Sequence, residues 1–121
     1  MRPVDYAEAR RAEILDEPVP FPSIPSVSTD PAYAKHIVEA AEWVAERMRR
    51  AGLEHVTINP TEGHPVVTAD WLHAKGAPTI LVYGHYDVQP PDPLDKWQSP
   101  PFEPQVRDHR LYARGVSDDK G

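Results

Sequence analysis

Apolar and polar residues follow a helical period in the first half of the chain. Residues 3–16 have a modest apolar face, and Pro18 ends the helix that they predict because proline cannot continue it. A stronger helix is predicted to begin after Asp30, with Pro31 at its first position and Gly52 at its end. Its apolar residues recur every three or four positions and predict one buried face, made by Ile37, Ala40, Ala41, Val44 and Met48.

After Gly52 the pattern changes to that of strands. Residues 55–58, 64–72 and 79–88 are predicted as three strands. The centre of the third, residues 80–83, is apolar without alternation, which is typical of a central strand covered on both faces. Helices followed by strands indicate the α/β class, here two helices followed by a mixed sheet that is incomplete.

Composition and charge narrow the class of protein. The chain has 121 residues, 40% of them hydrophobic and 26% charged, which suits one globular domain with a core. A net charge of -6 provides no broad basic surface, so no nucleic-acid partner is expected. No membrane partner is expected either, because no apolar run approaches 18 residues. The absence of cysteine excludes thiolate metal sites and suits a reducing compartment, so we expect a cytoplasmic location.

Candidate chemistry lies at the end of the third predicted strand, in the stretch "YGHYDVQP". Side chains alternate along a strand, so His85 and Asp87 should project to one side and Tyr86 to the other. A metal-binding imidazole needs its second ring nitrogen held by an acceptor, and Asp87 can provide one. The pair alone does not distinguish a metal site from an ordinary hydrogen-bonded pair at a strand end.

A second cluster of charge closes the sequence, in "RGVSDDKG". Residues 102–106 and 110–113 are predicted as short extended segments around a turn, and Gly115 then permits a sharp bend. Two adjacent carboxylates, Asp118 and Asp119, are costly to bury unless a cation compensates them, and a divalent metal would do so. The alternative is a solvated loop in which one aspartate caps a helix.

Taken together and in order, "GHYDV", "DKWQSPPFEP" and "LYARGVSDDKG" resemble a known family. It is the dinuclear zinc metallopeptidase superfamily that includes acetylornithine deacetylase, succinyl-diaminopimelate desuccinylase and the carnosinases. The stretch "YGHYDVQPPDPLDKW" most resembles the sequences of the cytosolic non-specific dipeptidase branch. The resemblance begins near residue 24 and is sharpest over residues 81–121. It implies that residues 1–121 are the amino-terminal portion of a metallopeptidase catalytic domain.

The resemblance also implies roles for single residues. His85 matches the first metal ligand, Asp87 matches the catalytic carboxylate that steadies its ring, and Asp118 matches the carboxylate that bridges two metals. A cis peptide bond between Asp118 and Asp119 is implied as well. Three further residues complete the motif: Asp119, Lys120 and Gly121. Two residues lie in the loop that the family shares, where they either pack the loop or line the substrate cleft: Trp97 and Phe102.

The activity implied by the resemblance is metal-dependent hydrolysis of an amide or peptide bond. Two zinc ions would serve it, with manganese or cobalt as alternatives, and the substrate would be a dipeptide or an N-acyl amino acid. The family's general base and remaining ligands would follow Gly121, so we expect this chain alone to be inactive and to bind zinc weakly or not at all. An unpaired sheet edge would favour a dimer or larger homo-oligomer. The alternative is a naturally short, non-catalytic interaction or dimerisation module.

Overall fold

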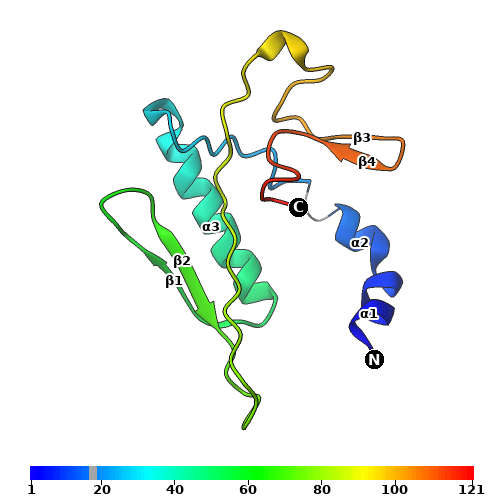
Figure 1. Ribbon diagram of the computed structural model, residues 1–121, viewed down its shortest axis with the longest axis vertical. Helices are drawn as coiled ribbons and strands as arrows, with labels where there is room; N and C mark the ends of the chain where they lie inside the picture. Colours follow the sequence, from blue (N-terminus) through cyan, green and yellow to red (C-terminus); the bar gives the residue numbers. More distant parts are fainter. Residues whose placement is uncertain (17–18) are drawn as a thin grey trace.

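The computed structural model describes residues 1–16 and 19–121 (Figure 1). It combines helices with short strands, so the α/β class is confirmed. The helical elements are α1 (Pro3–Ala9), α2 (Arg11–Asp16), the 3-10 helix η1 (Pro31–Tyr33), α3 (Ala34–Arg50) and the 3-10 helix η2 (Leu94–Lys96). The strands are β1 (Glu54–Asn59), β2 (Val66–Asp70), β3 (Gln105–Arg107) and β4 (Arg110–Tyr112).

The first predicted helix is divided in two. Arg10 leaves the helical region, with φ -114° and ψ 20°, and separates α1 from α2. Helix α1 buries none of its residues, and helices as short as these two are marginal alone. Pro18, which was expected to end the helix, lies outside the described residues.

The second predicted helix is confirmed. The Asp30 side chain accepts a hydrogen bond from the Ala32 N–H, so η1 begins at Pro31 and leads into α3. Gly52 follows the last turn with φ +85°, the left-handed conformation that favours glycine. Ile37, Ala40 and Ala41 are buried as expected, whereas Val44 and Met48 are only partly buried and Ala45 joins the buried face.

Helix α3 packs against the β1–β2 hairpin on one side, as Figure 1 shows. On another side it meets the loop of residues 19–30. Phe21 and Ile24 form a buried cluster with Ala40, and the ring of Phe21 stacks on Trp43 at 4.1 Å between centroids. The core of the molecule therefore lies between a helix and a proline-rich loop rather than between a helix and a broad sheet.

The sheet differs most from expectation. The strands form two separate antiparallel pairs, β1 with β2 and β3 with β4, in place of one mixed sheet. The third predicted strand is extended but unpaired over residues 79–87, and only Val88 makes an isolated parallel bridge, to Val27. The apolar residues 80–83 at its centre are exposed, from 81% for Ile80 to 92% for Leu81, whereas Val88 is buried. The reason is that a strand needs a neighbouring backbone, and the described residues offer one only at Val88.

The last hairpin agrees with the prediction. Strands β3 and β4 pair through Val106 and Leu111, and the turn residues Asp108 and His109 both have positive φ, 49° and 60°. Two positive φ values in a two-residue turn match the right-handed twist of the paired strands. The hairpin returns the chain toward Gly115 and so brings the terminal motif back to the core. None of the described helices has the length and hydrophobicity needed to cross a bilayer.

Candidate metal centre

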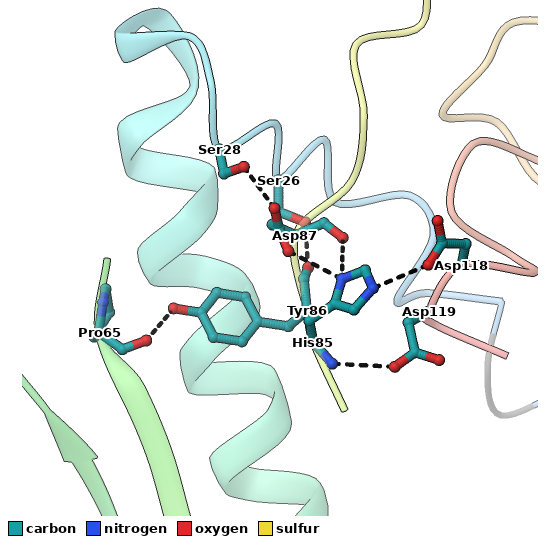
Figure 2. A network of polar contacts seen from close by, with 8 residues as sticks. All are labelled: Ser26, Ser28, Pro65, His85, Tyr86, Asp87, Asp118 and Asp119. Atoms are coloured by element: carbon teal, nitrogen blue, oxygen red, sulfur yellow. Dashed lines mark hydrogen bonds and ion pairs between the residues drawn. The ribbon is translucent and has the colours of Figure 1, made fainter. Parts of the chain in front are cut away.

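Three side chains predicted to work together meet in the structure. The Nδ1 atom of His85 lies 3.0 Å from Oδ1 of Asp87, and its Nε2 atom lies 2.9 Å from Oδ1 of Asp118 (Figure 2). Each ring nitrogen thus faces a different carboxylate. Asp118 reaches this position although 33 residues separate it from His85. Its side chain is 79% exposed, so the space beside both groups is open to solvent.

Two serines that sequence reasoning overlooked hold the segment of His85. Ser26 is fully buried, its hydroxyl donates to the carbonyl oxygen of Tyr86, and its own carbonyl accepts from the Val88 N–H at 2.9 Å. Ser28 donates its hydroxyl to Oδ2 of Asp87, which leaves Oδ1 free for His85. The signal in the sequence was the short run "IPSVS", where serines alternate with apolar residues as in a strand.

Tyr86 points away from the site, as alternation predicts. Its hydroxyl donates to the Pro65 carbonyl oxygen beside β2, which links the site to the first hairpin (Figure 2). Burial, and to a smaller extent the charge of Asp87, raises the pKa of the Tyr86 phenol, so the hydroxyl stays a donor. Hydrogen bonds at Tyr86 thus tie the residue after His85 both to Ser26 and to the first hairpin.

The turn that carries the two aspartates fits tightly against Val88. A Cβ atom on Gly115, whose φ is +83°, would lie 2.3 Å from Cγ1 of Val88, so only glycine suits this position. The Gly115 carbonyl oxygen accepts from the Lys120 N–H at 2.9 Å and closes the turn. The peptide bond between Asp118 and Asp119 is cis, as the resemblance implies.

Asp119 contacts the backbone of His85, whereas Asp118 contacts its ring. Its Oδ2 atom accepts the backbone N–H of His85 at 3.1 Å. Gly84 permits this approach, because a Cβ atom there would already lie 3.2 Å from the same oxygen. One carboxylate of the pair therefore holds the backbone of His85, and the other faces its ring.

Lys120 is buried rather than part of an exposed charged end. Only 5% of the residue is exposed, and its Nζ atom donates to the carbonyl oxygens of Phe21 and Ile24, at 3.1 and 2.7 Å. The amine also lies 4.6 Å from the ring centroid of Phe21, which adds a cation–π contact. Burial lowers the pKa of Lys120 to about 8, although the charges of Asp87 and Glu39 oppose that shift. Lys120 anchors the aspartate turn to the core.

Electrostatics around His85 favour its charged form when no metal is bound. Partial burial lowers the pKa of His85, but the hydrogen bonds to Asp118 and Asp87 outweigh it, and the net pKa is raised. Two carboxylates on one imidazole thus create a place that attracts positive charge.

The remaining predicted residues lie around the site. Trp97 donates its indole N–H to the Pro91 carbonyl oxygen, and the Arg114 guanidinium lies 5.1 Å from its ring centroid, so Trp97 packs within its loop. Phe102 lines a hollow of about 440 Å³ that also includes Val27. Gly121 sits against Val116, where a Cβ atom would meet the carbonyl oxygen at 2.3 Å.

The donors present suit a divalent metal ion. His85 offers Nε2 while Asp87 holds the opposite nitrogen, and the Asp118 carboxylate lies beside Nε2 on the exposed side. One imidazole and one carboxylate, with the imidazole oriented by a second carboxylate, are the donors that zinc uses in catalytic sites. The fold and the site together thus define the class: an α/β chain with a histidine–carboxylate cluster whose donors suit a metal ion.

Comparisons with known proteins agree with that class. The family model described as peptidase family M20/M25/M40 matches residues 81–121. Succinyl-diaminopimelate desuccinylase of Xylella fastidiosa (strain M23) is 36% identical over 113 residues, which cover 91% of this chain and 27% of the relative. The resemblance to the metallopeptidase and amidohydrolase superfamily is therefore confirmed.

Solved structures extend the agreement to the fold. Human carnosine dipeptidase 1 superposes with a TM-score of 0.84 at 26% identity, covering 96% of this chain and 27% of that one. The M20 family metallo-carboxypeptidase Sso-CP2 from Sulfolobus solfataricus gives a TM-score of 0.76 at 38% identity, covering 88% of this chain and 23% of that one. The chain spans between 20% and 27% of the length of the curated relatives it matches first.

Proposed function

We propose that this protein, at full length, hydrolyses amide or peptide bonds with the help of bound metal ions. The observation that carries the proposal is the placement of His85 between two carboxylates, Asp87 on Nδ1 and Asp118 on Nε2. His85 and Asp118 would hold metal, and Asp87 would orient the imidazole. Residues 1–121 would be the amino-terminal portion of the catalytic domain, which their 20% to 27% share of the relatives supports.

Hydrogen bonds give the residues around His85 different roles. Ser28 fixes Oδ2 of Asp87, so Oδ1 accepts the Nδ1 proton of a neutral His85 and leaves the Nε2 lone pair directed at the Asp118 side. Asp119 holds the His85 backbone, and this keeps the imidazole next to Asp118. When zinc is bound, it supplies a water of lowered pKa and stabilises negative charge on the carbonyl oxygen under attack.

We infer the substrate class from the described activities of the similar proteins. A dipeptide or an N-acyl amino acid is proposed, because the similar proteins are described as a desuccinylase, a dipeptidase and a carboxypeptidase. Two zinc ions, a cytoplasmic location and a homo-oligomeric state belong to the same proposal. The expectation that residues 1–121 alone are inactive stays a prediction, and assaying the 121-residue chain tests it.

The test measures hydrolysis and zinc affinity together. The full-length protein, supplied with zinc, is assayed against a panel of dipeptides and N-succinyl amino acids, because residues 1–121 alone are expected to be inactive. We expect His85→Gln and Asp118→Asn to abolish turnover, and Asp87→Asn to weaken zinc binding by about 10- to 100-fold, the usual loss when the partner of a ligating histidine is removed.

A matched control is Asp95→Asn, which changes a carboxylate whose side chain is 74% exposed and forms an ion pair with Lys96. It should leave both turnover and zinc affinity unchanged. Full turnover by His85→Gln would exclude the proposed site. Turnover lost equally in Asp95→Asn would show that the loss does not report on the site.

A further inference from the structure

Another group of metal-binding side chains lies at the end of the first hairpin, where β1 begins and β2 ends. It shares no residue with the His85 site. Glu54 and Asp70 are direct cross-strand partners in the antiparallel register, although both carry negative charge. Like charges directly opposite each other destabilise a strand pair, so this position calls for a compensating cation.

His55 brings an imidazole to the same place. The strand register shifts between Glu54 and Thr57, and His55 adopts φ +51°, a left-handed conformation that interrupts the regular alternation of β1. Its Nδ1 atom lies 2.9 Å from Oδ1 of Asp70. One ligand atom each from Glu54, His55 and Asp70 lie within 4.8 Å of one another.

A second histidine supports the cluster from the loop after β2. The Nε2 atom of His73 lies 2.9 Å from Oε1 of Glu54, and its ring packs edge-on against Trp71 at 5.3 Å between centroids. Each carboxylate of the cross-strand pair is therefore matched with its own imidazole. This arrangement resembles the way in which outer hydrogen bonds orient the ligands of a metal.

We propose that Glu54, His55 and Asp70 form a surface site for a divalent transition-metal ion such as zinc, with His73 as the residue that positions Glu54. One nitrogen and two carboxylate oxygens suit zinc, which binds such donors at about 2.0–2.2 Å, and solvent completes the coordination. The side chains of Glu54 and His55 are 49% and 76% exposed, so an ion can enter and leave freely.

The competing explanation is two ion pairs between protonated histidines and carboxylates. Those pairs need no metal, and at such exposed positions they contribute little to stability. The two explanations differ in what happens when both imidazoles are neutral. Ion pairs then disappear, whereas a metal ion still neutralises Glu54 and Asp70 together.

The test is calorimetric titration of Zn²⁺ at pH 7.5 into the protein carrying both His85→Gln and Asp118→Asn, which together remove the two ligands that this chain offers to the first site. We expect one saturable zinc equivalent. His55→Asn should weaken it by more than about tenfold, the loss seen even when an outer partner of a ligand is removed. Asparagine suits this substitution because it tolerates the left-handed backbone of residue 55. Co²⁺ should give visible absorption bands that His55→Asn removes.

The matched control is His36→Gln, which removes an imidazole paired with a single carboxylate, Glu39, at 3.0 Å on helix α3. It should leave the zinc equivalent unchanged. Glu54→Gln keeps the backbone and His55, so it tests the site even if His55→Asn disturbs the hairpin, and it should also weaken binding by more than about tenfold. Absence of the equivalent, or its full retention in Glu54→Gln, overturns the proposal.

Discussion

Helix α3 and the segment of residues 79–84 both carry large apolar side chains, but only the helix buries them. Ile37 on α3 is 1% exposed, whereas Ile80 is 81% exposed. The helix satisfies its backbone internally and needs only one covered face, which the first hairpin and residues 21 and 24 provide. An extended segment must also find backbone partners, and among the described residues none pairs with residues 79–84. The first such bond comes later, where the Val88 N–H donates to the Ser26 carbonyl oxygen. Hydrophobicity therefore specifies what can be buried, and a neighbouring element decides whether it is.

The largest expected effect tests this contrast with one substitution made in both regions. Ile37→Ala should lower the free energy of unfolding by about 2–5 kcal/mol, because it opens a cavity beneath α3. Ile80→Ala should change it by less than about 0.5 kcal/mol, since that side chain is already in solvent. Chemical denaturation of the two variants measures both values. Equal losses would contradict the contrast, since they would place Ile80 in a packed environment.

A smaller effect is expected at Lys120, where a charged residue belongs to the buried region. Lys120→Met keeps most of the side-chain volume but leaves the carbonyl oxygens of Phe21 and Ile24 without their donor. We expect a loss of about 1–3 kcal/mol in the free energy of unfolding.

The control for Lys120 is Lys96→Met, which changes a side chain that is 77% exposed and forms an ion pair with Asp95. It should be neutral in the same denaturation experiment. If Lys120→Met proved equally neutral, the amine would not anchor the aspartate turn. The position of that turn would then depend on the fit of Gly115 against Val88 and on the bonds from His85 to the two aspartates.

The smallest effect concerns α1, which buries no residue and depends on surface contacts. Asp5 accepts two hydrogen bonds from the Arg2 guanidinium, and these lower the pKa of its carboxyl below the ordinary value of 3.8. Because the folded pKa is depressed, the stabilisation is present above pH 3.8 and is lost as the pH falls through the folded value. Carbon NMR of the Asp5 carboxyl should show a low midpoint that Arg2→Gln restores to normal. An unchanged midpoint in Arg2→Gln would remove the pair as the cause.

Patterns among residues close together in the sequence were enough to predict many local features of the structure. The cap at Asp30, the end at Gly52, the buried face of α3, the last hairpin and the bend at Gly115 each depend on neighbours a few residues away. The same holds for the side to which His85 and Asp87 point, because alternation along an extended chain sets it.

Other features depended on residues far apart in the sequence. No local pattern placed Ser26 and Ser28 beneath residues 86–88, or the Lys120 amine on the Phe21 and Ile24 carbonyls 99 and 96 residues away. Likewise, the apolar run of residues 80–83 predicted a central strand, yet whether a strand is central depends on which backbones lie beside it. The sequence by itself determined which groups could form the site. Only the tertiary structure decided which of them meet, because long-range hydrogen bonds and packing depend on where the rest of the chain lies.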